Sequence, residues 1–107
     1  MKFLVMWELD LARLGAAVVH AVLRMPEYAQ KLAEQGKLEK RYHVVGKHGG
    51  AWIYDVVSNE ELERLLAMAP VYNYARYDIY PLAEMETPTH VLKESDETSP
   101  NQTPEVA

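Results

Sequence analysis

Two histidines and an arginine lie within eight residues of one another near the middle of the chain. Arg41 is followed by His43 and, after a short gap, by His48. An imidazole exchanges a proton near neutral pH, and a guanidinium binds a carboxylate through paired hydrogen bonds. If this segment is a strand, Arg41 and His43 point to the same side, together with Val45. The spacing favours an acid–base group that faces a ligand, and the alternative is an ordinary half-exposed strand histidine.

Arg76 and Asp78 are also two residues apart, in a segment with strand-like alternation. They form either an ion pair at a contact between subunits or a clamp for a carboxylate, in which Asp78 orients Arg76. His43 and His48 do not have the spacing of common metal-ligand patterns, so the sequence predicts no metal site. The chain has no cysteine, which excludes a disulfide scaffold, a zinc ribbon and a thiol nucleophile.

The hydrophobic pattern predicts six elements that position these side chains. Strands are expected at residues 2–8, 40–46, 51–57 and 73–80, with helices at residues 14–35 and after a capping box formed by Ser58 and Glu61. Pro26 falls inside the first helix and predicts a kink or a break into two helices. Residues 47–50 include two glycines and predict a hairpin loop. This order predicts an α+β, ferredoxin-like βαββαβ fold with a four-stranded antiparallel sheet.

Two helices cover only one face of such a sheet. The chain has two tryptophans and seven tyrosines, which is more aromatic surface than two helices would cover. An uncovered apolar sheet face is typical of a contact between subunits. The sequence therefore predicts a homo-oligomer joined through its sheet faces.

The chain has 107 residues, of which 49% are hydrophobic, and a formal charge of −5. This length corresponds to one domain. Residues 93–107 contain four acidic residues, one lysine and no aromatic residue, so they predict a flexible acidic tail after a folded domain at residues 1–92. Net acidity without a basic cluster argues against nucleic acid as a partner. The chain has neither a membrane-length apolar run nor a signal-peptide pattern, which predicts a cytoplasmic protein without a membrane partner.

Four short motifs resemble the muconolactone Δ-isomerase family. They are Gln35-Gly36-Lys37-Leu38, Val44-Val45-Gly46, Tyr54-Asp55-Val56-x-Ser58 and Pro70-Val71-Tyr72-x-Tyr74. The resemblance covers residues 1–92 and implies a ferredoxin-like subunit in a dimeric α/β-barrel type of assembly. It also implies a homo-oligomer, from a dimer up to a decamer, with its pocket between subunits. The implied reaction moves a proton on a small unsaturated lactone in aromatic catabolism, without a metal or cofactor.

The resemblance assigns roles to particular residues. Such a reaction needs a base and an acid, a donor for the developing negative oxygen and a cation for the substrate carboxylate. Glu27 matches an acidic position of the family and is predicted, with His43, to carry the proton. The predicted substrate-binding residues are Arg41, Tyr42, His48, Trp52, Tyr54, Tyr74 and Arg76.

The chain departs from the family pattern at several positions. The family usually has Trp-Arg where this chain has Tyr42-His43, Ala-Asn where it has Gly49-Gly50, a His at Glu63 and an Ile at Tyr77. These departures leave two alternatives open. One is an isomerase or cyclase that acts on a larger polycyclic or polyketide-like substrate in natural-product biosynthesis. The other is an oligomer that binds small molecules without catalysis.

Overall fold

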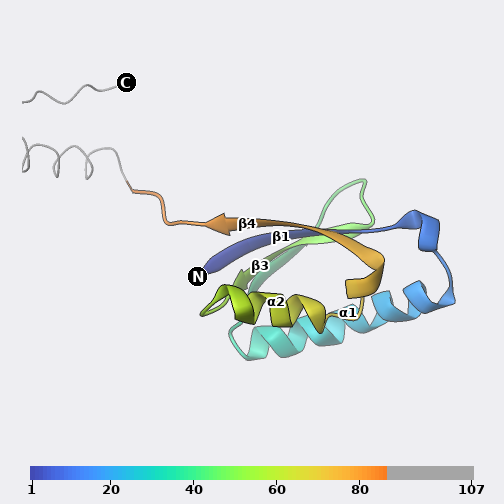
Figure 1. The fold of residues 1–107 in the computed structure, drawn as a ribbon, viewed down its shortest axis with the longest axis horizontal. Coiled ribbons are helices and arrows are strands. Elements are labelled where there is room, and N and C mark those ends of the chain that lie inside the picture. Colours follow the sequence, from blue (N-terminus) through green and yellow to red (C-terminus); the bar gives the residue numbers. More distant parts are fainter. Residues whose placement is uncertain (87–107) are drawn as a thin grey trace, which may run out of the picture.

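The computed structural model describes residues 1–86, so the predicted tail at 93–107 and the predicted domain end at residue 92 lie outside it. The elements are β1 (Lys2–Leu9), α1 (Ala16–Glu34), β2 (Leu38–His43), β3 (Gly49–Asp55), α2 (Asn59–Ala67) and β4 (Ala75–Leu82), with short 3₁₀ turns η1 (Leu11–Arg13) and η2 (Tyr72–Tyr74). The strands form one antiparallel sheet in the order β2-β3-β1-β4. Both helices lie on the same side of this sheet (Figure 1). This is the ferredoxin-like arrangement that the element order predicts.

Strand register divides the sheet into two different faces. Val5 of β1 lies opposite Trp52 of β3 and Ile79 of β4, and these side chains point toward the helices. The core between sheet and helices comprises Phe3, Val5, Trp52, Tyr54 and Val56 on the sheet side and Ala21, Met25, Ala29, Leu32, Leu62, Leu65 and Leu66 on the helix side. Leu4 and Ile53 are opposite each other on the other face, which neither helix covers. No helix in residues 1–86 has both the length and the hydrophobicity to cross a membrane.

The first helix continues through its proline. α1 runs unbroken from Ala16 to Glu34 with Pro26 inside it, so the alternative of two separate helices is wrong. Proline has no N–H, and the carbonyl oxygen of Val22, four residues earlier, therefore lacks its helical hydrogen bond. Packing of the apolar face of α1 on the sheet outweighs this loss. The chain leaves the helix through Gly36, whose φ of 72° favours glycine.

The predicted capping box opens α2. The backbone N–H of Glu61 donates to Ser58 Oγ at 3.1 Å, as expected for an N-cap serine. The Glu61 carboxylate accepts from the backbone N–H of Val57 at 3.2 Å, one residue earlier than the usual partner. Lys37 Nζ lies 3.5 Å from the same carboxylate and links the end of α1 to the start of α2.

The boundaries predicted for the second strand and its hairpin loop are wrong. β2 is Leu38–His43 rather than 40–46, and Gly49 and Gly50 belong to β3 rather than to the loop. The pairing of β2 with β3 begins earlier than expected, at Leu38, and includes a register shift between Leu38 and Lys40. Val45 is 98% exposed in the loop, so it does not share the face of the preceding strand residues.

The last strand is also displaced from its expected position. Residues 73 and 74 form part of η2, and β4 begins only at Ala75. The strand expected to end at residue 80 continues through Pro81, which lies opposite Phe3 of β1. A proline is tolerated there because β4 is an edge strand, whose outward N–H groups have no ladder partner.

One partly buried hydroxyl joins the two helices and predicts a pH-dependent stability. The Tyr28 hydroxyl donates to the backbone carbonyl of Leu65, and burial raises the pKa of Tyr28 to about 12. The unfolded chain loses this proton near pH 10 and the folded chain only near pH 12. Stability from the neutral hydroxyl is therefore complete below pH 10, and the free energy of unfolding falls as the pH rises from 10 to 12.

Urea unfolding at pH 8 and pH 11 tests this prediction. Tyr28→Phe is expected to lower the free energy of unfolding at pH 8 by about 1 kcal/mol, the contribution of one hydrogen bond. The variant should also lose less stability than the wild type between the two pH values. Burial raises the pKa of Tyr54 and Tyr77 as well, so some alkaline loss remains in the variant. An equal loss in both proteins would contradict the assignment to Tyr28.

Candidate active site

A cavity of about 440 Å³ lies between α1 and the β2–β3 end of the sheet. Its lining comes from four elements: Val22, Met25 and Pro26 of α1, Trp7 of β1, Arg41, Tyr42 and His43 of β2, and Gly49, Gly50 and Trp52 of β3. We call it the α1 cavity. Its volume is in the range of small-molecule sites, and its wall combines apolar side chains with a few polar groups.

The irregular start of β2 decides which side chains reach the α1 cavity. Leu38 lies opposite Tyr54 and Lys40 opposite Ile53, so the strand uses two residues where its partner uses one. After this shift Arg41 is opposite Trp52 and His43 is opposite Gly50, on the helix side of the sheet. The guanidinium and the imidazole are therefore on one wall, as their spacing predicts.

Two indole N–H groups approach each other over Gly50. The rings of Trp7 and Trp52 meet edge to face, with centroids 6.1 Å apart. A Cβ at Gly50 would lie 3.0 Å from Trp52 Nε1 and 3.1 Å from Trp7 Nε1, which is tighter than most real contacts. The absence of a side chain at Gly50 therefore gives both indoles their position.

The Trp7 indole nitrogen is buried and has no hydrogen-bond partner within residues 1–86. A buried donor without a partner is uncommon in proteins and costs free energy. Across the α1 cavity, Pro26 leaves the carbonyl oxygen of Val22 without its helical partner. Both residues of this helix turn line the cavity. Within residues 1–86 the cavity therefore borders an unpaired donor, Trp7 Nε1, and the helix turn in which Pro26 removes one backbone hydrogen bond.

Glu27 is placed less favourably than His43. It directly follows Pro26 on α1 and does not line the α1 cavity, whereas His43 does; both residues are exposed in the single chain. His48 is exposed in the loop before β3, where its carbonyl oxygen accepts from the N–H of Leu9 at 2.8 Å.

The remaining predicted residues lie away from the α1 cavity. Tyr54 is 2% exposed in the core, and its ring stacks on Trp52 with centroids 6.2 Å apart. Tyr74 is half-buried in η2 and packs against the core. Arg76 lies on the uncovered face of the sheet, where it lines a small groove with Asp78. The structure thus brings together Arg41, His43 and Trp52. Tyr42 contributes to the lining of the α1 cavity, but its position opposite Ala51 is on the uncovered face of the sheet. The other five candidates lie away from the α1 cavity.

Trp7 and Gly50 were not among the candidate residues. Trp7 follows Phe3 and Val5 in the alternation of the first strand, which indicates a core residue but does not reveal its free N–H. Gly50 was expected in a loop, where the turn itself accounts for a glycine and no close tertiary contact is implied. The close approach of two indoles to this position follows only from the tertiary structure.

The α1 cavity has the groups for binding an anion and for moving a proton. Arg41 can pair with a carboxylate, and His43 can accept and return a proton. Indole N–H groups can donate to an oxygen on which negative charge develops. These groups suit a small organic acid that also carries a carbonyl group.

Comparison with known proteins identifies the family of the chain. The sequence profile described as "Muconolactone delta-isomerase" matches residues 1–87. Muconolactone Delta-isomerase of Cupriavidus pinatubonensis is 39% identical over 61 residues, which are 57% of this chain and 66% of that protein. The protein of the same description from Acinetobacter baylyi is 36% identical over 55 residues, 51% of this chain and 57% of that protein. The matched segments therefore span less than two thirds of these relatives.

Solved structures share the fold. A crystal structure of muconolactone isomerase superimposes with a TM-score of 0.70 at 23% identity, covering 79% of this chain and 91% of that one. A 5-chloro-2-hydroxyhydroquinone dehydrochlorinase from Burkholderia phenoliruptrix, solved with 2,5-dihydroxybenzoquinone, superimposes with a TM-score of 0.60 at 11% identity, covering 79% and 96%. At these identities the similarity concerns the fold alone. Because the family profile matches residues 1–87, which include all of the described residues, the chain belongs to the muconolactone delta-isomerase family.

Proposed function

We propose that this protein is a cofactor-independent isomerase that moves a proton, and with it a double bond, on a small unsaturated lactone carrying a carboxylate. Family membership supports the reaction class. The observation that carries the proposal is the position of Arg41 and His43 on one wall of the α1 cavity. A cation for the carboxylate and a proton carrier for the ring are the two groups that this reaction most needs.

Substrate binding begins with the carboxylate. The Arg41 guanidinium pairs with it, and this fixes the ring of the lactone against Trp52 and Met25. Val22 and Met25 of α1 form the apolar side of the cavity, against which the ring packs. The substrate is then held with one ring carbon beside the His43 imidazole.

Proton transfer then takes place in two steps at His43. The neutral imidazole removes a proton from the ring carbon next to the double bond, and the electrons move toward the lactone carbonyl. The negative oxygen of this intermediate accepts hydrogen bonds from indole N–H groups, of which Trp7 Nε1 is unpaired within the described residues. The imidazolium returns the proton to the carbon beside the carbonyl. The product is the isomeric lactone, and no other reactant is needed.

Muconolactone is the first substrate to test. The wild type is expected to convert it to the enol-lactone, followed by absorbance. Arg41→Gln should raise KM by about 10-fold or more, because a charged hydrogen-bonded pair is lost. Arg24→Gln is the matched control, since Arg24 is exposed on α1 and does not line the α1 cavity. Absence of turnover in the wild type, or equal effects of the two variants, would refute the proposal.

We also propose that the uncovered sheet face packs against a second copy of the chain. Leu4, Met6 and Ile53 are only partly buried there, although they are apolar. Ile53→Lys is expected to reduce the mass measured by sedimentation equilibrium, because a charge would be buried at the contact. Val57→Lys is the control, since Val57 is 82% exposed in the loop after β3. An unchanged mass for Ile53→Lys would exclude this face as the interface.

A further inference from the structure

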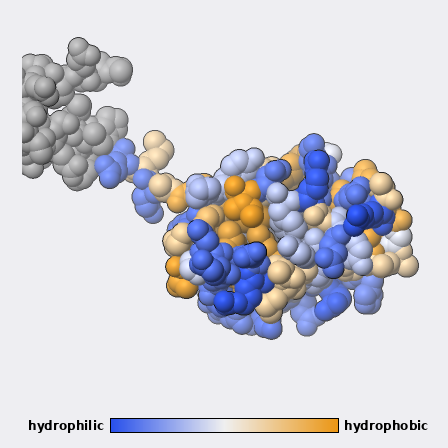
Figure 2. Space-filling view, viewed as in Figure 1, coloured by the Kyte–Doolittle hydropathy of each residue, from blue (hydrophilic) through white to orange (hydrophobic). Residues whose placement is uncertain are grey.

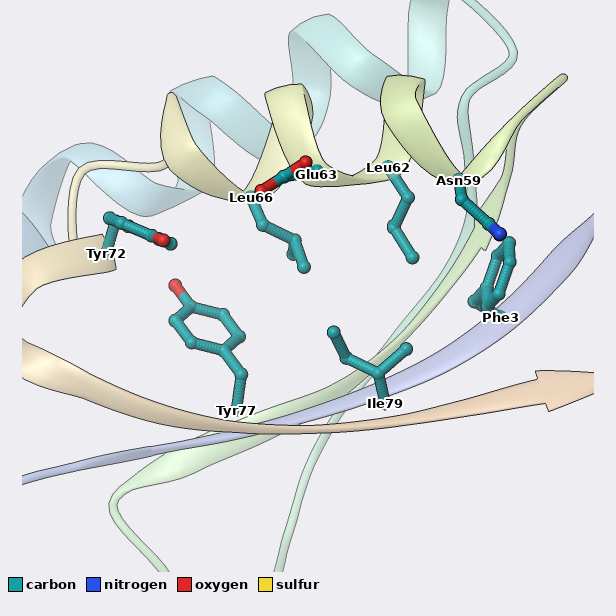
Figure 3. Close-up of a pocket in the computed structure, with 8 residues that line it drawn as sticks. All are labelled: Phe3, Asn59, Leu62, Glu63, Leu66, Tyr72, Tyr77 and Ile79. Atoms are coloured by element: carbon teal, nitrogen blue, oxygen red, sulfur yellow. The ribbon is translucent and has the colours of Figure 1, made fainter.

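A second cavity, of about 450 Å³, lies between α2 and the strands β1 and β4. It is lined by Phe3, Asn59, Leu62, Glu63, Leu66, Tyr72, Tyr77 and Ile79, and it shares none of these residues with the α1 cavity. We call it the α2 cavity (Figure 3). It exists because α2 is only nine residues long and leaves the helix side of β4 partly uncovered. Ile79 points to this side and is still 44% exposed.

The α2 cavity has two apolar walls that face each other. Leu62 and Leu66 are one helical turn apart and project from α2 toward the sheet (Figure 3). Tyr77 and Ile79 project toward them from β4. Figure 2 shows hydrophobic surface gathered over the strands β4 and β1, next to the hydrophilic surface of α2. A slot between two such walls fits a flat ring better than a flexible chain.

One end of the α2 cavity carries an unpaired donor. The Tyr77 hydroxyl is buried and has no hydrogen-bond partner among residues 1–86. It lies beneath Tyr72, with ring centroids 5.8 Å apart (Figure 3). Burial raises the pKa of Tyr77, so the hydroxyl stays protonated at neutral pH and can donate. A ligand oxygen at this end would satisfy a group that is otherwise costly to bury.

The charges of the two cavities are opposite. The α1 cavity contains Arg41 and His43, which favour an anion. The α2 cavity contains Glu63, on the helix side, and Asn59 at its other end. A carboxylate at the edge of an apolar slot disfavours a second anion through charge repulsion. The ligand of the α2 cavity is therefore not an anion. Because the rest of the described lining is apolar or neutral, it favours an uncharged ring whose oxygen belongs to a hydroxyl or carbonyl group.

We propose that the α2 cavity is a second small-molecule site, which binds an uncharged aromatic ring through a hydrogen bond from Tyr77 to a ring hydroxyl or carbonyl oxygen. This inference goes beyond the proposed isomerase activity and does not depend on it. The ring lies between Leu66 and Ile79, and its oxygen points toward Tyr72 and Tyr77.

A matched pair of probes tests the proposal. 2-Naphthol and 2-naphthoate have the same ring system, but at pH 7 the first is neutral and the second is an anion. Isothermal titration calorimetry of the full chain is expected to detect 2-naphthol binding in the presence of saturating 2-naphthoate, because the two occupy different cavities. Arg41→Gln should weaken 2-naphthoate binding and leave 2-naphthol binding unchanged.

Two variants localise 2-naphthol to the α2 cavity. Tyr77→Phe keeps the ring and removes only the hydroxyl, and it should weaken 2-naphthol binding by about fivefold to tenfold. Ile79→Trp fills the slot from an exposed strand position and should weaken binding by at least about 10-fold. The proposal is overturned if 2-naphthol does not bind at millimolar concentration, if both variants bind it as the wild type does, or if 2-naphthoate displaces it.

Discussion

Replacing His43 by Gln is expected to lower kcat for muconolactone by about 10²-fold or more, with little change in KM. The imidazole is the proton carrier that β2 places on the wall of the α1 cavity, opposite Gly50. Glutamine has a comparable size and retains hydrogen bonding, but it does not exchange a proton at neutral pH. The loss should therefore appear in the chemical step, while Arg41 continues to bind the carboxylate.

His48 provides the matched control for this variant. It lies five residues further along the chain, is exposed and does not line the α1 cavity. His48→Gln should keep kcat within about twofold of the wild type. Glu27→Gln tests the other predicted proton carrier. A loss of kcat near 10²-fold would show that Glu27 carries the proton in one of the two transfer steps. If His43→Gln retains full activity, His43 is not the proton carrier.

Replacing Gly49 by Ala is expected to destabilise the fold by about 3 kcal/mol. Gly49 lies opposite Glu8 in the β1–β3 ladder, and a Cβ there would be 1.8 Å from the carbonyl oxygen of Trp7. This oxygen belongs to the backbone of a central strand, so no side-chain rotation relieves the overlap. The two strands must separate locally, and this also displaces Trp7 from the α1 cavity.

Urea unfolding of three glycine variants separates crowding from a general effect of alanine. Gly15→Ala should change the free energy of unfolding by less than about 1 kcal/mol, because Gly15 has extended backbone and no atom within 4 Å of an added Cβ. Gly50→Ala should lower the free energy of unfolding by an amount between those of the other two variants, since a Cβ at Gly50 would lie 3.0 Å or slightly more from its nearest atoms. Equal midpoints for Gly49→Ala and the wild type would show that the strands tolerate a side chain there.

Signals that act over a few residues were sufficient to predict most of the fold. Ser58 and Glu61 mark the start of α2 because a capping box is a local hydrogen-bonding pattern. The alternation of Phe3 and Val5 marks β1 because a strand repeats every two residues. The helix through Pro26 was harder to predict, since packing against the sheet decides whether a proline breaks a helix.

Errors arose where distant residues decide the outcome. Val44 and Val45 look like strand residues, yet β2 ends at His43 and the chain turns through Gly46, whose φ is 81°. Tyr54 has a hydroxyl group that could bind a ligand, but the residue lies on the face of β3 that points into the core. Arg76 was a plausible carboxylate clamp until the register placed it on the opposite face from Arg41.

The register also places opposite each other the two residues that carry the unpaired donors of residues 1–86. Trp7 of β1 and Tyr77 of β4 are directly opposite residues of adjacent strands, and each lines a different cavity. Opposite side chains on neighbouring strands are in contact range. A ligand that shifts one of these rings would therefore move the wall of the other cavity, and any resulting change in affinity has the same factor in both directions. One cross-strand pair is thus the shared boundary of the proposed anion site and the proposed neutral-ring site.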